Sequence, residues 1–363
     1  MGLCRQLRAD IEALAAIERP SASRGERDSA EWIAARLREV GAEHVRLQPY
    51  RYQGTFAQSH ALHYASGVLA ALGGNRVLAA AALASFELDY SGRAQWLRRL
   101  LPAADGVNVV GRLPARGERR RALVLVAHHD AARTGLMWEP RLLALGDRIA
   151  ARTGRRASYA LVPELAFVGA VLGLRRLPAA LLMAAVALSL DQARSPVVPG
   201  ANDNASGVAA MLELVRRLAH ERPDDMEVTA VAPGGEEAGM GGMRAWLADA
   251  RPSLSGDGTL VLGLDTVGSG EPVALASEGG VWAVRYGKEE VTRAERAGLR
   301  SWRLGGWTDP VLARLAGLRA ISILSVREGG IPNYHLPSDV PDQVDLACVE
   351  RCVEAAHTLA TTA

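Results

Sequence analysis

The chain places an apolar run directly before a polar cluster in the stretch Leu123-Val124-Leu125-Val126-Ala127-His128-His129-Asp130. A short run of aliphatic residues is typical of a strand that is buried on both faces of a sheet. Similar runs occur at 107–110, 228–231, 260–264 and 321–326. Helical periodicity separates several of these runs, and strands that alternate with helices predict a mostly parallel sheet covered on both faces. We therefore expect an α/β three-layer sandwich around a mostly parallel, mixed central sheet.

Amphipathic helices are expected on both sides of these runs. The segments with apolar residues at helical spacing are 4–17, 28–40, 205–219, 239–249 and 344–360. The sequence contains no internal repeat and no low-complexity linker. We therefore expect residues 1–363 to form a single α/β domain.

Two apolar segments, residues 61–86 and 159–190, do not fit a plain α/β domain. Each resembles a hairpin of two apolar helices with a polar tip. The longest uninterrupted piece, 159–174, would form a helix of about 24 Å, whereas a bilayer core is roughly 30 Å thick. We expect two inserted helical hairpins that pack within the protein or against a second copy, as in a homo-oligomer. Membrane association is the alternative, either on the surface or across it if each hairpin is one long helix.

Composition excludes several classes of protein. The 42 basic and 40 acidic residues leave a net charge of +2, so no nucleic-acid-binding surface is expected. The hydrophobic fraction of 49% is too high for a disordered chain. The first residues lead into helical periodicity and show no signal peptide. We therefore expect a cytoplasmic protein.

Five short polar segments follow expected strands or precede expected helices. They are 127–130, 200–207, 234–239, 264–268 and 334–339. In an open α/β sheet, such positions converge at the carboxyl ends of the strands. Two histidines and several carboxylates, without a cysteine among them, form a donor set that suits zinc or another divalent metal ion.

Two neighbouring metal ions need a shared carboxylate between them and terminal ligands on each side. Asp203 suits the shared position because a helix begins just after it, and a helix N-terminus stabilises a carboxylate. His128 and Asp265 would then bind one ion, and Glu237 and His335 the other.

Glu236 and Glu237 are neighbours at the end of an expected strand, so their side chains point in different directions. Glu237 can bind metal while Glu236 accepts a proton from the water between the ions, as a general base. Asp130 lies two residues after His128 on the same face of an extended chain, where it can fix the tautomer of the imidazole. Each residue alone has an ordinary structural explanation, such as a helix cap for Asp203. Their joint occurrence indicates a site.

This ordered set of segments resembles that of the co-catalytic di-zinc aminopeptidase and glutamate carboxypeptidase-like metallopeptidase family, which includes bacterial leucyl aminopeptidases. The resemblance covers most of the chain outside the two apolar segments. The ligands of two Zn²⁺ ions that it implies are His128, Asp203, Glu237, Asp265 and His335. It also implies that Glu236 is the general base and that Asp130 orients a ligand. By the same resemblance, Tyr334 would stabilise the oxyanion formed during attack.

One departure from the family pattern lies between His128 and Asp203, which the family normally joins by a short connection. Here that connection contains residues 159–190, which would emerge near the mouth of the site. This insertion would restrict substrate size, form a lid, or bring the enzyme to a membrane.

The residues and the resemblance together predict a zinc-dependent exopeptidase, most simply an aminopeptidase, that acts through a metal-bridging hydroxide. Its substrate would be a peptide or a small amide. One alternative on the same scaffold is a single-zinc, glutaminyl-cyclase-like acyltransferase. Another is a non-catalytic, membrane-associated interaction protein, which the presence of every ligand residue disfavours.

Overall fold

The computed structural model describes residues 2–362 and contains a nine-stranded sheet. Its strands are β1 (Glu43–Tyr52), β2 (Ala104–Leu113), β3 (Arg121–Val126), β4 (Met226–Ala232), β5 (Thr259–Leu264), β6 (Glu271–Glu278), β7 (Val284–Arg285), β8 (Arg300–Leu304) and β9 (Arg319–Val326). They lie in the order β1-β2-β4-β3-β5-β9-β6-β7, and β8 pairs with β6. The four central strands, β4, β3, β5 and β9, are parallel, and antiparallel pairs flank them. The expected mostly parallel, mixed sheet is confirmed.

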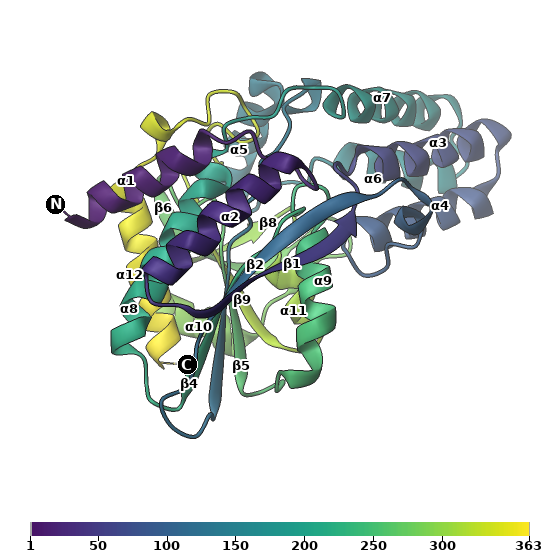
Figure 1. Ribbon diagram of the computed structural model, residues 1–363. Coiled ribbons are helices and arrows are strands. Elements are labelled where there is room, and N and C mark those ends of the chain that lie inside the picture. Colours follow the sequence, from purple (N-terminus) through teal and green to yellow (C-terminus); the bar gives the residue numbers. More distant parts are fainter. Residues whose placement is uncertain (1, 363) are drawn as a thin grey trace.

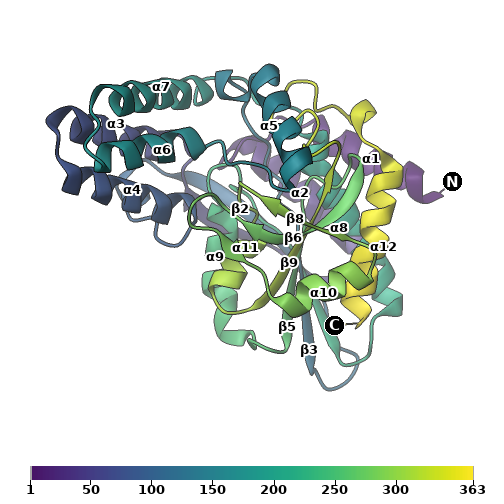
Figure 2. The ribbon, with the colours of Figure 1, turned by 180° about the vertical axis from the view of Figure 1, so that it is seen from behind.

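Helices cover both faces of this sheet. The α-helices are α1 (Gly2–Ala15), α2 (Arg24–Glu39), α3 (Ala57–Gly73), α4 (Arg76–Tyr90), α5 (Pro140–Thr153), α6 (Leu161–Val171), α7 (Arg176–Gln192), α8 (Gly207–Glu221), α9 (Gly241–Ala250), α10 (Lys288–Arg296), α11 (Pro310–Leu315) and α12 (Leu346–Thr362). Helices α1, α2, α8 and α12 pack together on one face, and α9 and α11 lie on the other (Figures 1 and 2). The three-layer sandwich is therefore also confirmed.

The sequence patterns missed β1, β6, β7 and β8, which lie toward the two edges of the sheet. Buried and exposed residues alternate along much of β1 and β8. Such strands contain no continuous apolar run, so the pattern that identified the central strands is absent from them.

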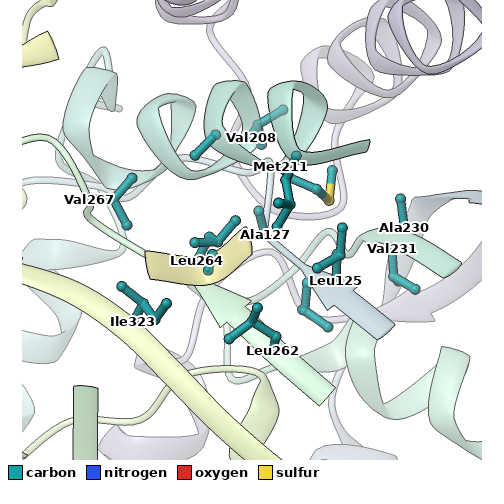
Figure 3. Close-up of a cluster of buried hydrophobic side chains, with 14 of the residues drawn as sticks. Leu125, Ala127, Val208, Met211, Ala230, Val231, Leu262, Leu264, Val267 and Ile323 are labelled. Atoms are coloured by element: carbon teal, nitrogen blue, oxygen red, sulfur yellow. The ribbon is translucent and has the colours of Figure 1, made fainter. Parts of the chain in front are cut away.

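The main core lies between α8 and the parallel strands. Val208 and Met211 of α8 are fully buried and point toward Leu125 and Leu262 of the sheet (Figure 3). Burying a side chain of this size stabilises the fold by roughly 1.5–3 kcal/mol. This packing holds the N-terminus of α8 over the strand ends, and the loop that contains Asp203 leads directly into that terminus.

The two apolar segments form two pairs of helices rather than two long helices: α3 with α4, and α6 with α7. These four helices, here called the helical unit, pack on one another around a core of their own. The unit projects from one side of the α/β body (Figures 1 and 2). Among residues 2–362, none of the helices combines the length and apolar character required to cross a bilayer.

A glycine allows the helices of this unit to approach closely. A Cβ atom at Gly67 of α3 would lie 2.3 Å from the ring of Phe167 and 2.8 Å from the side chain of Leu182. Any larger residue at position 67 would therefore separate α3 from α6 and α7.

The helical unit also buries two carboxyl groups, Glu87 of α4 and Glu164 of α6. Burial and the neighbouring Glu87 raise the pKa of Glu164 to about 7. Burial likewise raises the pKa of Glu87. At neutral pH, these two groups therefore resist ionising together.

This arrangement predicts a pH-dependent contribution to stability. The pKa of folded Glu164 lies above the ordinary value of 4.5, so the folded protein binds more protons than the unfolded chain between these two values. Its contribution therefore falls as the pH rises through this range. We expect the free energy of unfolding of Glu164→Gln to fall less between pH 5 and pH 8 than that of the parent, by about 1 kcal/mol after screening. Denaturant titrations at both pH values measure this.

The matched control is Glu295→Gln, which changes an exposed side chain. It should keep the parent's pH dependence. If Glu164→Gln also keeps it, the buried carboxyl pair does not titrate as described.

Candidate metal centre

The parallel strands deliver side chains to one edge of the sheet. His128 and Asp130 follow the end of β3, Glu236 and Glu237 follow β4, and Asp265 follows β5. Parallel strands end at the same edge, and polar groups of open α/β sheets collect there. Three of the five polar segments therefore meet because of the sheet alone.

Two further segments reach the same place from loops. Asp203 lies in the turn that precedes α8, and His335 lies in the loop after β9. His335 has a φ of 56° and Thr266, next to Asp265, a φ of 48°. These left-handed conformations are uncommon outside glycine and concentrate at functional sites.

The predicted ligands form two groups that share Asp203. Its Oδ1 lies 3.3 Å from Nε2 of His128, and its Oδ2 lies 3.2 Å from Nε2 of His335. Nε2 of His128 lies 3.9 Å from Oδ2 of Asp265, and Nε2 of His335 lies 3.3 Å from Oε2 of Glu237. Each oxygen of one carboxylate thus faces a different histidine and a different second carboxylate.

These separations fit metal ions. Ligand atoms of tetrahedral zinc lie about 3.3 Å apart, because each is roughly 2.0–2.1 Å from the ion. Within residues 2–362, Oε1 of Glu237 and Nδ1 of His335 are buried and form no hydrogen bond. A buried, unpaired carboxylate is costly unless a cation compensates it. The donor set therefore fits one ion with His128, Asp203 and Asp265, and another with Asp203, Glu237 and His335.

Glu236 lies beside both groups. Its carboxylate, that of Glu237 and a nitrogen of His128 also lie within reach of one ion. Because Glu236 lies this close to His128 and Glu237, it can act on a group held at the site. It does not belong to the groups of three that contain Asp203.

Asp130 fixes several of these residues at once. Its Oδ1 lies 3.4 Å from Nδ1 of His128. Its two oxygens accept hydrogen bonds from the backbone N–H groups of Glu236 and Glu237, each at 3.1 Å. The hydroxyl of Ser21 donates a further bond of 2.6 Å. The sequence suggested only the contact with His128.

Asp339 holds the Asp203 loop, and sequence reasoning missed this role. Its carboxylate accepts hydrogen bonds from the backbone N–H groups of Asn202 at 2.8 Å and Asp203 at 3.0 Å. The only available signal was that Asp339 belongs to the same polar segment as His335. Burial raises the pKa of Asp339 to about 7.

Asn204 connects the Asp203 loop to the strand that carries Asp265. Its side-chain oxygen accepts bonds from the backbone N–H groups of Gly207 and Thr266, both at 3.1 Å. Its side-chain nitrogen donates to the carbonyl of Leu264 at 3.0 Å. Asn204 therefore fixes the distance between the two loops.

Arg19 is a second support that the sequence did not reveal. It is fully buried and donates hydrogen bonds to the carbonyls of His129, Pro199 and Gly200 at 2.7–2.8 Å. One side chain from the connection between α1 and α2 thus joins the loops on both sides of the site.

His129 faces away from the cluster, although it follows His128. Its Nδ1 lies 2.8 Å from the hydroxyl of Ser29, and its Nε2 lies 3.0 Å from the carbonyl of Val107. Burial lowers the pKa of His129 to about 4, so the ring is neutral at pH 7.

Asp309 is a further buried carboxyl that sequence reasoning missed. It immediately precedes α11, and among residues 2–362 neither of its carboxyl oxygens has a hydrogen-bond partner. Burial, and to a smaller extent the charges of Asp130 and Asp265, raise its pKa well above the usual range. The sequence showed only an aspartate before a proline.

The charge of the site is concentrated on Asp203. Burial alone would raise its pKa, but hydrogen bonding from His128 and His335 lowers it below the usual value. By contrast, burial raises the pKa of Glu236 and of Glu237 well above the usual range. Burial and the charge of Asp203 raise the pKa of Asp265 to about 7. A cation bound here would favour the ionised form of each carboxylate.

A pocket connects this cluster to the helical unit. Glu236, Glu237 and His335 line one end of it. Aromatic side chains line much of the rest, and the other lining residues are Arg98, Gly239, Met240 and Gly306. The aromatic residues are Phe56, His60, Tyr90, Trp138, Tyr159, Trp307 and Tyr334. The helical unit and its flanking residues therefore supply much of the wall beside the cluster.

Tyr334 and Trp138 pack on His335, one of the two histidines of the cluster. The ring of Tyr334 stacks on His335 at 3.8 Å, and that of Trp138 contacts His335 edge-on at 4.4 Å. The guanidinium of Arg156 lies over the Tyr334 ring at 4.6 Å. These contacts fix the orientation of His335.

Parts of the sequence are similar to known peptidases. The description Peptidase family M28 matches residues 186–360, which include Asp203, Glu236, Glu237, Asp265 and His335 but not His128. Aminopeptidase YwaD of Bacillus subtilis (strain 168) is 31% identical over 157 residues, or 40% of this chain and 33% of that protein. The match thus spans about a third of the curated relative.

Solved structures share the fold over nearly the whole chain. The aminopeptidase from Aneurinibacillus sp. strain AM-1 has a TM-score of 0.59 at 15% identity, covering 98% of this chain and 92% of that chain. BSAP, a zinc aminopeptidase from Bacillus subtilis, has a TM-score of 0.56 at 16% identity, covering 98% and 93%. The glutaminyl cyclase of Bacteroides thetaiotaomicron has a TM-score of 0.57 at 16% identity, covering 99% and 98%.

The three-layer body is therefore a fold that this chain shares with solved aminopeptidases and a glutaminyl cyclase, and the histidine–carboxylate cluster lies at its strand ends. Residues 186–360, just under half of the chain, are thus similar to peptidase family M28.

The shared position of Asp203 predicts how metal binding responds to substitution. Asp203→Ala should lose both ions, because each group uses one of its oxygens. Asp265→Ala removes a member of one group only and should retain about half of the metal. Elemental analysis after equilibration with zinc and gel filtration measures both.

The control is Asp257→Ala, which removes an exposed carboxylate of the same kind. It should keep the parent's metal content. Parent-like metal content in folded Asp203→Ala would disprove the shared-ligand arrangement.

Proposed function

We propose that the protein is a zinc-dependent exopeptidase of the aminopeptidase type that hydrolyses peptides or small amides. The observation that carries this proposal is the position of Asp203, with one oxygen directed at His128 and the other at His335. The match of residues 186–360 to peptidase family M28 and the partial similarity to an aminopeptidase support the reaction class.

The two groups around Asp203 are the proposed holders of two zinc ions. His128 and Asp265 complete one group, and Glu237 and His335 complete the other. When bound, zinc would polarise the substrate carbonyl and make the attacking water more acidic. Asp130 orients His128 and, through the backbone, both glutamates, so the donor atoms are held in place before an ion arrives.

Glu236 is the proposed general base. It lies beside the cluster, while its neighbour Glu237 belongs to the group with Asp203 and His335. Its carboxylate would accept a proton from the attacking water and return it to the leaving nitrogen. Burial raises the pKa of Glu236, and a cation held by the neighbouring ligands would keep the carboxylate ionised and able to accept this proton.

Tyr334 is the proposed donor to the oxyanion. It lines the pocket next to His335, and the stacked rings fix its position. Burial raises the pKa of its hydroxyl well above the usual value, so the group remains protonated and able to donate.

The aromatic pocket is the proposed seat of the substrate side chain next to the cleaved bond. Its lining combines Glu236 and His335 of the cluster with aromatic residues such as Phe56, Tyr90 and Tyr159. Aromatic walls favour large apolar side chains, because these lose most contact with water there.

The first test separates the roles of the two glutamates. Glu236→Gln preserves shape but removes the proton acceptor, so turnover of an amino-acid amide should fall by roughly 10²–10⁴ with metal content unchanged. Glu237→Gln should instead lower metal content, and added zinc should restore part of the activity. Single-turnover assays combined with elemental analysis measure both effects.

If the two variants exchange these behaviours, the roles of Glu236 and Glu237 are reversed. If both retain the parent's turnover, the active site lies elsewhere. The same preparations distinguish a glutaminyl-cyclase-like reaction, which would convert N-terminal glutamine to pyroglutamate and release no amino acid from an amide. Both groups around Asp203 are complete, including the one formed by His128, Asp203 and Asp265. A second complete group favours hydrolysis at two ions over a reaction at a single zinc.

The second test concerns the pocket. Phe56→Ala enlarges the pocket, so kcat/KM for leucine or phenylalanine amide should fall about tenfold relative to that for alanine amide. The ratio of two substrates on one preparation does not depend on the fraction of active enzyme. Leu69→Ala, at an exposed position of the same helical unit, is the control and should keep the parent's ratio. If the ratio is unchanged in Phe56→Ala, the pocket does not determine which substrate side chain is preferred.

A further inference from the structure

The outer end of the helical unit consists of two turns, residues 72–78 and 171–177, here called the tip. Nε of Arg76 donates a hydrogen bond of 2.7 Å to the carbonyl of Val171. The Arg175 side chain lies against Gly74, where a Cβ atom would have no room. The connections between α3 and α4 and between α6 and α7 are therefore in contact, although about 100 residues separate them in the chain.

The tip exposes large aliphatic side chains. The exposed fractions are 56% for Leu72, 80% for Val77, 67% for Leu172, 55% for Leu174 and 65% for Leu177. Exposure of apolar residues continues along α3 at Leu69 and along α6 at Leu165. Single exposed leucines are common on protein surfaces, but a contiguous group of this kind marks a binding surface.

The charge around these side chains has one sign. Residues 61–86 and 165–190 contain Arg76, Arg175 and Arg176 and no aspartate or glutamate. All three arginines are exposed. Exposed leucines among arginines, without acidic residues, are typical of segments that enter the interface of an anionic bilayer.

Other occupants fit this surface less well. In a symmetric contact between two copies, the three arginines of one tip would face those of the other. A helix that crosses a bilayer is excluded within residues 2–362. Shallow insertion requires neither a second tip nor a long helix, because leucines reach the acyl boundary while arginines remain at the phosphates.

We propose that the tip inserts into the surface of membranes that contain anionic lipids, so that the protein binds to them peripherally. This inference does not depend on the catalytic proposal. The other end of the same helices lines the aromatic pocket at Phe56 and Tyr90. α3 has 17 residues, so docking by the tip would hold the pocket about 25 Å from the lipid surface.

The test is sedimentation of the full chain with vesicles. One set contains phosphatidylcholine alone, and the other contains phosphatidylglycerol in addition. We expect binding to the anionic vesicles, weakened by high salt because exposed charges are screened.

Two groups of variants test the surface itself. R76Q/R175Q/R176Q should bind about 100-fold more weakly, since each basic side chain near an anionic surface contributes roughly fivefold in affinity. V77S/L174S/L177S should also weaken binding, because it removes apolar contacts and leaves the charge unchanged. The matched control R46Q/R112Q/R296Q removes the same charge from exposed positions of the α/β body and should bind as the parent does.

Several outcomes would overturn the proposal. The parent protein could remain in the supernatant with both kinds of vesicle, or bind both equally well. The control triple variant could weaken binding as much as the tip variants, which would indicate a general charge effect. In another outcome, the parent forms a dimer in analytical ultracentrifugation and does not bind vesicles, and the tip variants are monomers. This result would assign the tip to self-association. Circular dichroism and thermal unfolding confirm that each variant is folded.

Discussion

A buried concentration of negative charge governs the architecture around the strand ends. Asp130, Asp203, Glu236, Glu237 and Asp265 share this space with two histidines. Carboxylates that are taken from water and placed together repel one another, and folding must either neutralise them or provide compensating positive groups. The raised pKa values of Glu236, Glu237 and Asp265 express this repulsion, and the lowered pKa of Asp203 marks the position where the histidines relieve it.

The surrounding structure resists this repulsion through the backbone. Asp130 accepts hydrogen bonds from the N–H groups of both glutamates, and Asp339 accepts them from the Asp203 loop. Arg19 adds a fully buried positive charge among carbonyls on either side. Its pKa is lowered to about 10 by burial, so it remains charged at neutral pH. The cluster is thus held by directed bonds that do not require an ion to be present.

The central sheet and the polar cluster were accessible from the sequence for different reasons. β3, β4, β5 and β9 are buried on both faces, so each shows a continuous apolar run. The polar residues were recognisable because few other arrangements bring such donors to successive strand ends. Arg19 and Asp309 carried no such signal. Arg19 acts on carbonyls 110 to 181 positions away, and any residue can supply a carbonyl. Strands such as β1 are exposed on one face, so polar residues occupy that face and interrupt any continuous apolar run.

The contacts of Arg19 and Asp339 also determine when the cluster can form. Arg19 lies between α1 and α2, near the start of the chain, while His335 and Asp339 follow β9, the last strand in sequence order. In the chain, the two loops that Arg19 joins are separated by α5, α6 and α7. Contacts between such distant parts of the sequence close late, because long loops must be ordered first. A chain still emerging from the ribosome therefore cannot assemble the cluster until nearly all of it has been synthesised, whereas the helical unit ends at residue 192 and can already be folded.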